Sequence, residues 1–155
     1  MLERLSLSEV LELLDRIPRG TPLFAVQLET VFLPCKECGA KSGKNGRLTK
    51  EFDGIVYTAP CPKCSTQEVR EKNGLVKRGK SKVIEGHYSA FYGYISPYVR
   101  EVRLRLSYGE DAVFDASYDS TDHFVFQTRK QAENFANPDD FGERTIFHKG
   151  GYIGG

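Results

Sequence analysis

The chain has 155 residues, a formal net charge of +1, 39% hydrophobic residues and 28% charged residues. This length and composition are typical of a soluble globular protein with one domain of ordinary size or two small ones. No apolar run approaches the roughly 20 residues that span a bilayer. The apolar region of a signal peptide is uncharged, whereas acidic residues interrupt the N-terminal apolar region of this chain. We therefore expect a cytoplasmic protein with no membrane partner.

Residues 1–33 predict a helix followed by a strand. Ser6 and Glu9 have the spacing of a capping box, which marks the start of a helix. Apolar residues then recur along one helical stripe, at Leu7, Val10, Leu11, Leu14 and Ile17. Pro18 ends this pattern, and residues 23–33 are typical of a strand. Such a stripe packs on its own domain or docks into a groove on another protein, and both interpretations stay open here.

All four cysteines lie in two Cys-x-x-Cys pairs, each preceded by a proline, and 22 residues separate the pairs. In a reducing compartment such thiol pairs persist by binding metal or through redox chemistry. Zinc favours four soft ligands in a tetrahedron, with thiolates at about 2.3 Å. Turn signals and a short strand between the pairs predict a hairpin that brings them together. We therefore predict one structural Zn²⁺ ion with the ligands Cys35, Cys38, Cys61 and Cys64.

Two other uses of the cysteines are weaker interpretations. Two disulfides require an oxidising compartment, to which nothing in the sequence points. A thioredoxin-like redox site needs one low-pKa cysteine at a helix N-terminus, which two matched pairs do not easily provide. Four thiolates leave no open coordination position, so the predicted site supports folding and not catalysis.

The two cysteine segments also carry a resemblance. Residues 34–39 and 60–64, PCKECG and PCPKC, resemble the two knuckles of zinc ribbons. They are less similar to the zinc domain of bacterial J-domain co-chaperones, whose glycine repeat is broken here. The resemblance implies a zinc-ribbon β-hairpin over residues 34–68.

Charge is distributed unevenly along the chain. Residues 34–82 hold twelve Lys and Arg against five Asp and Glu, a net charge of +7, whereas residues 105–143 have a net charge of −6. Within a basic connector at residues 69–82, Asn73-Gly74 is a candidate hairpin turn. The basic segment either binds phosphate backbones or only keeps the protein soluble. The candidate nucleic-acid or partner-binding residues are Lys41, Lys44, Arg47, Lys50, Arg70, Lys77, Arg78, Lys80, Lys82, Tyr92 and Tyr94.

Residues 83–137 predict a run of antiparallel strands. Within it, residues 99–109 alternate in character, which is typical of a strand with one buried face. The apolar positions of this alternation are Val102, Leu104, Leu106 and Tyr108. Tyrosines on these strands, including Tyr92 and Tyr94, either stack bases from an exposed face or fill the core of a small barrel.

The last part of this run carries a second resemblance. The phrase FVFQTRKQAE, residues 124–133, is similar to the final strand and helix of small SH3-like β-barrels in uncharacterised bacteriophage and prophage proteins. Within it, Thr128 and Gln131 have capping-box spacing and predict a short helix. The resemblance covers residues 83–137 and implies a small antiparallel SH3-like β-barrel with that helix, in the cytoplasm of a host cell. Residues 138–155 form a C-terminal tail outside it.

The predicted fold class is therefore α+β, with an N-terminal helix, a zinc-ribbon hairpin and a small barrel. Enzyme chemistry has little support, because the three histidines lack metal-ligand spacing and no phosphate-binding glycine loop occurs. We expect a non-enzymatic module that binds and modulates a host or phage protein complex, such as transcription or defence machinery. The other hypothesis is a nucleic-acid-binding regulator that uses the basic ribbon face and surface aromatic residues. The opposed charges of the two halves also suit a homo-oligomer.

Overall fold

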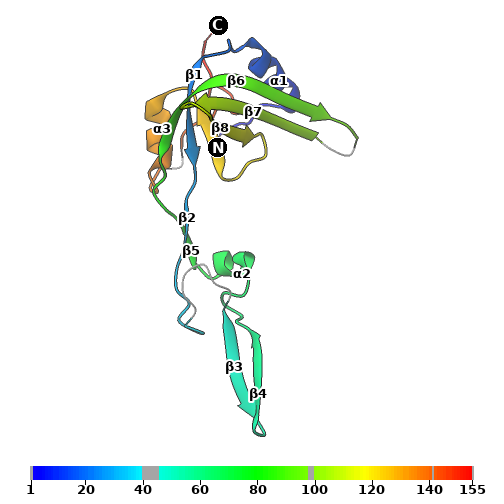
Figure 1. The fold of residues 1–155 in the computed structure, drawn as a ribbon, viewed down its shortest axis with the longest axis vertical. Helices are drawn as coiled ribbons and strands as arrows, with labels where there is room; N and C mark the ends of the chain where they lie inside the picture. Colours follow the sequence, from blue (N-terminus) through cyan, green and yellow to red (C-terminus); the bar gives the residue numbers. More distant parts are fainter. Residues whose placement is uncertain (1, 40–45, 98–99, 141, 155) are drawn as a thin grey trace. The chain divides into compact units, whose positions relative to one another are not determined.

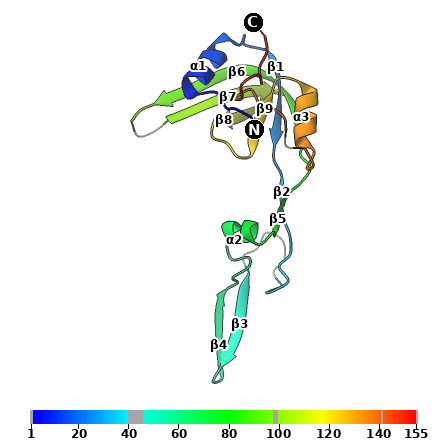
Figure 2. The same ribbon diagram turned by 180° about the vertical axis from the view of Figure 1, so that it is seen from behind.

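The computed structural model describes residues 2–39, 46–97, 100–140 and 142–154. Its fold is α+β, as predicted, with short helices and antiparallel sheets. The chain divides into two compact units, shown from opposite sides in Figures 1 and 2. We call Met1–Glu29 with Lys80–Gly155 the sheet unit, and Thr30–Gly79 the cysteine unit. The five segments expected from the sequence are a finer division, which stays a prediction.

The sheet unit is built on a five-stranded antiparallel sheet with the order β8-β7-β6-β1-β9. Its strands are β1 (Pro22–Gln27), β6 (Val83–Ile95), β7 (Arg100–Tyr108), β8 (Ala112–Ser117) and β9 (His123–Phe126). The early strand β1 lies between the late strands β6 and β9, so the middle of the sheet joins residues far apart in the sequence. Along β7, Val102, Leu104 and Leu106 are buried while the residues between them are not, which confirms the predicted alternation.

Helix α1 (Leu7–Arg16) covers one face of this sheet. The capping box between Ser6 and Glu9 is present, as predicted. The apolar stripe packs on the helix's own sheet, with Val10 and Leu14 fully buried, and Leu11 lies over Gly93 of β6. No helix in the described part of the chain is long and apolar enough to cross a membrane.

Helix α3 (Arg129–Ala136) packs on β1, β6 and β9. Its capping box between Thr128 and Gln131 confirms the predicted helix start. Ala132 and Ala136 are buried against Val26 of β1 and Phe126 of β9 in a second apolar cluster. In Figure 1, α3 lies beside β1 while α1 lies along β6 and β7.

The expected closure into an SH3-like barrel is not seen among the described residues. Strands β8 and β9 are the two edges of the sheet, and no ladder joins them in the part of the chain that the structure describes. They approach through side chains, since the His123 ring lies 4.8 Å from the Phe114 ring and its Nδ1 atom 3.0 Å from the Asp115 carbonyl oxygen. Strand β9 has only four residues, all paired with β1, which leaves little length for a second ladder.

The segment predicted as a C-terminal tail is part of the core of the sheet unit. Ile146 and Phe147 are buried in the same apolar cluster as α1. The Leu5 N–H donates a hydrogen bond of 2.8 Å to the Phe147 carbonyl, and the Ile146 N–H donates one of 3.0 Å to the Val125 carbonyl. This segment therefore joins the N-terminal residues to β9.

The cysteine unit contains two small antiparallel ribbons and one helix. One ribbon pairs β2 (Thr30–Phe32) with β5 (Val76–Arg78), and the other pairs β3 (Arg47–Phe52) with β4 (Ile55–Pro60). Between β4 and β5 lies α2 (Gln67–Lys72). The strand expected over residues 23–33 is thus two strands, β1 and β2, that belong to different units.

The basic connector is not a hairpin turning at Asn73-Gly74. Thr66 caps α2, and Asn73 ends it by donating its backbone N–H to carbonyls of the last turn. Gly74 follows with a φ of 70°, a left-handed conformation that glycine adopts readily. The Asn-Gly step therefore ends a helix, and β5 pairs instead with β2, more than 40 residues earlier in the chain.

Candidate metal centre

The two Cys-x-x-Cys pairs meet in the cysteine unit. The four Sγ atoms of Cys35, Cys38, Cys61 and Cys64 all lie within 4.8 Å of one another, and none forms a disulfide. The Sγ atoms of Cys35 and Cys61 are 3.9 Å apart, and those of Cys38 and Cys64 are 3.4 Å apart. In a tetrahedron of thiolates at about 2.3 Å from the ion, neighbouring sulfurs are about 3.8 Å apart. The four side chains are therefore positioned to bind one metal ion.

Each pair forms a tight turn with backbone N–H groups directed at sulfur. The Gly39 N–H bonds to the Cys35 carbonyl and the Ser65 N–H to the Cys61 carbonyl, both at 3.0 Å. The Lys63 N–H donates to Cys61 Sγ at 3.5 Å. Gly39 has a φ of 72°, which confirms that the first turn uses glycine's conformational freedom. Such N–H groups stabilise sulfur in its charged, metal-binding form.

In the absence of a cation, the thiols of Cys35 and Cys64 have different pKa values. A hydrogen bond from the Cys38 backbone N–H lowers the pKa of Cys35 to about 7, against the opposing effect of burial. Burial raises the pKa of Cys64 to about 12. Three of the four thiols are buried, and Cys38 is partly buried. Such a set, which cannot all ionise alone, fits a site completed by a cation, because a metal ion keeps its thiol ligands deprotonated.

Gly46 lets the backbone approach two of the sulfurs closely. A Cβ atom built on this glycine would lie 2.3 Å from Cys38 Sγ and 2.3 Å from Cys64 Sγ. A side chain here would therefore overlap these two ligand atoms and displace them. The Gly46 carbonyl also accepts a hydrogen bond of 2.9 Å from the Cys61 N–H. In the sequence Gly46 is only half of an Asn-Gly turn signal, and nothing there places it beside the sulfurs.

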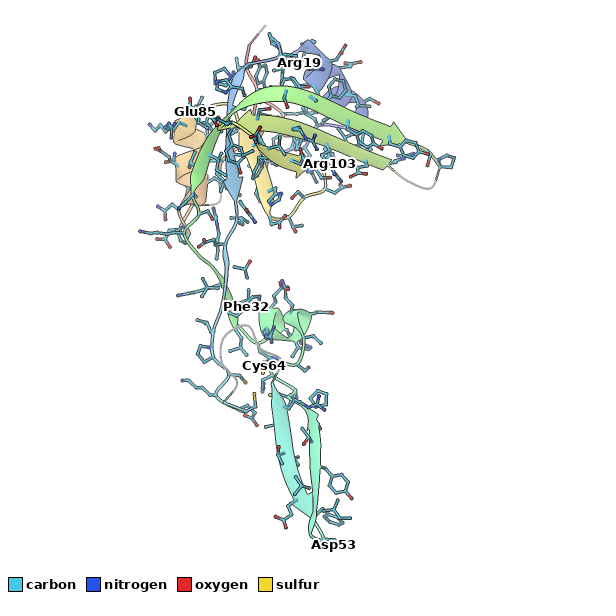
Figure 3. All side chains as sticks on the ribbon, in the orientation of Figure 1. Arg19, Phe32, Asp53, Cys64, Glu85 and Arg103 are labelled. Atoms are coloured by element: carbon cyan, nitrogen blue, oxygen red, sulfur yellow. The ribbon has the colours of Figure 1, made fainter. Side chains whose placement is uncertain are left out.

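The metal centre lies at one end of the β3–β4 hairpin. Leu48 of β3 and Leu75 pack against the cysteines and form the small apolar cluster of this unit. Figure 3 shows Cys64 at this end and Asp53 at the tip of the hairpin. All of β4 and nearly all of β3 are exposed, including Phe52, Ile55, Val56 and Tyr57. The hairpin is thus held at its metal end and exposed along its length.

The cross-strand pairs give this hairpin two different faces. Successive residues of a strand point to opposite faces, so Lys50 with Tyr57 and Phe52 with Ile55 share one face. We call these four residues the apolar hairpin face. The opposite face presents Thr49 with Thr58 and Glu51 with Val56.

Within each ribbon of the cysteine unit, the described basic residues that were predicted to bind do not share one face. Lys41 and Lys44 lie outside the described residues. On β3, Arg47 and Lys50 are three residues apart and so point to opposite faces, and on β5 the same holds for the adjacent Lys77 and Arg78. Arg70 is buried in α2, with its guanidinium 5.3 Å from the Phe32 ring, while Lys80 and Lys82 belong to the sheet unit.

The two predicted tyrosines are together on the sheet unit. Tyr92 and Tyr94 lie two residues apart on β6, and both are more than half exposed. Arg103 and Glu101 of β7 stand directly opposite them. Figure 3 labels Arg103 on this strand.

Comparisons with protein-family models, with curated proteins and with solved structures find no match for this chain.

Proposed function

We propose that this chain is a non-enzymatic accessory protein that binds another protein through the apolar hairpin face. In this proposal the ion at the four cysteines is zinc, and the cysteine unit is a zinc ribbon. Zinc is the common structural ion of four-thiolate sites, and a site saturated by four sulfurs leaves no position for substrate. The metal then has one task, which is to hold the base of the hairpin.

The exposed apolar hairpin face carries the proposal. Phe52 is 70% exposed and Ile55 56% exposed, on the same face as Tyr57. Soluble proteins rarely leave contiguous large apolar side chains in water unless the surface binds something. An isolated two-stranded hairpin is also marginally stable in water, and among the described residues this one packs on the rest of its unit only near the cysteines. A protein partner would bury the exposed rings and support the strands.

The residues of the apolar hairpin face indicate the kind of partner surface that would bind it. Lys50 is the single charged residue on the apolar hairpin face, beside Tyr57. We infer a partner groove that is apolar with one acidic group positioned for this ammonium. The resemblance to phage proteins makes a host protein complex the candidate source of that groove. Nucleic-acid binding by the basic ribbon face has less support, because Arg47 and Lys50 point away from each other.

The test compares two substitutions that differ mainly in the face they change. Ile55→Ser and Val56→Ser each remove a β-branched side chain from β4, at positions 56% and 63% exposed. They lie on opposite faces of the hairpin. Tagged wild type and both variants are used to capture proteins from bacterial lysate with and without nuclease treatment, and the retained protein is then purified and its affinity measured directly. Metal content is compared first, to show that both variants keep the site.

We expect a partner retained by wild type and by Val56→Ser and lost or weakened at least about tenfold by Ile55→Ser, as for a buried apolar anchor at an interface. Equal retention by both variants, or loss of the partner on nuclease treatment, would contradict the proposal.

A further inference from the structure

The sheet has an open region on the face opposite α1. Helix α3 covers this face only where it meets β1, β9 and the start of β6. Over the rest of β6, β7 and β8, side chains alternate between buried residues under α1 and solvent-facing residues on the other side. We call the solvent-facing side chains of Ala90, Tyr92, Tyr94, Glu101, Arg103, Arg105 and Asp115 the tyrosine face. We propose that the tyrosine face binds the bases of single-stranded nucleic acid.

The two tyrosines have the placement of a stacking platform. Tyr92 and Tyr94 point to the same side of β6 and are 57% and 51% exposed. Tyr88, on the buried side of the same strand, is 1% exposed and its hydroxyl donates a hydrogen bond to the Leu14 carbonyl. The fold therefore uses one tyrosine of this strand for its core and leaves two in water. Exposed aromatic rings on a sheet stack successive bases, because every base has a π-face.

A hollow lies beside the first ring. It has a volume of about 450 Å³ and is lined by Tyr92, Arg103, Arg105 and Asp115, among others. Its lining also includes Ala90, which has a small side chain. Ala90 faces Arg105 across the ladder and Tyr92 faces Arg103, so a planar ring stacked on Tyr92 would meet guanidinium groups at its edge. An open, shallow hollow of this kind accepts a base that remains attached to its strand.

The charges of this face are arranged for a ligand with both donors and acceptors. Arg103 pairs with Glu101, and Arg105 binds Asp115 through Nε at 2.8 Å and Nη2 at 3.0 Å. The side chains of Arg103 and Arg105 are 46% and 51% exposed, against 33% and 29% for their carboxylate partners. A ligand therefore meets the cations first and the carboxylates beneath them. Base edges present acceptors to arginine and donors to carboxylates, and the strand adds phosphates.

The ion pairs of Arg103 and Arg105 also predict how the affinity for a single strand depends on salt concentration. The two arginines are already bound to carboxylates, so few phosphates are neutralised when a strand binds. Because each phosphate contact to a single strand contributes a log–log salt slope of about −0.7, we expect a total slope no steeper than about −1.4. Stacking, which is sequence-tolerant, then supplies most of the affinity.

The experiment is fluorescence anisotropy with full-length protein and a fluorescein-labelled single strand of about 12 nucleotides, within the about 4–16 that one such face occupies. Single-stranded DNA and RNA of one sequence are compared with the matching duplex. Tyr92→Ala and Tyr94→Ala remove the rings, while Tyr92→Phe and Tyr94→Phe retain them. Ile55→Ser, on the cysteine unit, shows whether the site is separate from the proposed protein interface.

We expect each alanine variant to weaken single-strand binding about 5- to 160-fold, which corresponds to the roughly 1–3 kcal/mol lost with one stacked base. The phenylalanine variants and Ile55→Ser should stay within about twofold of wild type, and the duplex should bind more weakly. Free nucleoside monophosphates are added as competitors of the labelled strand. If they displace it from wild type as well as an unlabelled strand does, and this displacement depends on Tyr92, the ligand is a mononucleotide and the single-strand proposal is overturned. Equal affinity for duplex and single strand, or no binding at about 100 μM protein, the weak end of non-specific association, overturns the proposal.

Discussion

The two units of this chain solve the problem of stability in different ways. The sheet unit buries residues of α1, of all five sheet strands and of Ile146-Phe147 in one continuous apolar cluster. Among the described residues of the cysteine unit, the buried apolar cluster consists of Cys35, Cys61 and Cys64, with Cys38, Leu48 and Leu75 packed against them. A segment of this size buries too little apolar surface to fold unaided, and a structural metal is a common remedy. In the cysteine unit, four thiols therefore take the place that a hydrophobic core has in the sheet unit.

The two exposed surfaces, the tyrosine face and the apolar hairpin face, also differ in how they are supported. The tyrosine face belongs to a sheet that is supported by α1 on its other side, so its residues are held by tertiary packing. The apolar hairpin face has no layer behind it, since both faces of the hairpin are exposed. Its geometry therefore depends on the metal centre, whereas that of the tyrosine face does not.

The largest expected effect follows from removing a metal ligand. Cys61→Ser should abolish metal binding and unfold the cysteine unit, because structural zinc contributes about 10–16 kcal/mol of apparent binding free energy. Metal analysis by mass spectrometry and amide hydrogen exchange measure this, with protection lost in β3, β4 and β5 and retained in β6 and β7. Ser65→Ala, next to the second pair, is the control and should keep one metal ion per chain. Equal loss of protection in β6 and β7 would show that the two units are not independent.

A smaller effect is expected when a side chain enters the metal site. Gly46→Ala places a Cβ 2.3 Å from two sulfurs, so metal affinity should fall at least about tenfold, as it does on loss of supporting contacts around a metal. Gly142→Ala is the control, because its added Cβ would meet only Asp140 Oδ1 at 3.8 Å. Competition with a chromophoric chelator measures both affinities. Unchanged affinity in Gly46→Ala would mean that the ion is held away from this glycine.

A cavity in the sheet unit should lower the stability of that unit without affecting the metal centre. Leu14 is fully buried, so Leu14→Ala should lower the free energy of unfolding of this unit by about 2–5 kcal/mol and leave metal content unchanged. Val113→Ala removes a half-exposed side chain from β8 and should cost less than about 0.5 kcal/mol. Urea unfolding followed by hydrogen exchange in β6 and β7 measures the difference. Metal loss in Leu14→Ala would remove the distinction between the two cores.

The smallest effect is a pH dependence confined to the sheet unit. Burial lowers the pKa of His148, with nearby Arg4 and Arg144 acting in the same direction. Its Nδ1 atom accepts a hydrogen bond of 3.1 Å from the Thr145 N–H, which requires the neutral ring. Below about pH 6.5, the ordinary value, the unfolded chain takes up this proton more readily than the folded one. Stability should therefore fall as the pH drops below that value, until the pH reaches the folded-state pKa.

The thermal midpoint of wild type between pH 8 and pH 5 measures this dependence. His148→Asn can keep an acceptor near Thr145 but does not titrate, so its midpoint should fall less over the same range. Because the metal centre is common to both proteins, its own sensitivity to acid cancels in the comparison. Parallel curves for the two proteins would assign the acid sensitivity to other groups.

Much of the local structure could be predicted from the sequence because its signals are local. The capping boxes at Ser6 and Thr128, the alternation in β7 and the spacing within each Cys-x-x-Cys pair each depend on residues a few positions apart. The metal ligands could be predicted because thiol spacing and ligand chemistry restrict the choices to few. These features are decided by backbone hydrogen bonding and side-chain period alone.

Other features depended on contacts between distant residues, which only the tertiary structure decides. Strand β1 pairs with β6 and β9, and β2 with β5, so a single apolar run divides between two units. Gly46 is a metal-site residue only because the folded chain carries its backbone to the sulfurs. Ile146-Phe147 is a short apolar step in a glycine-rich stretch with no period, and its burial comes from packing on α1 and β9. Which tyrosines face water is likewise decided by where α1 and α3 cover the sheet, since alternation assigns residues to a face and packing alone selects the face that is buried.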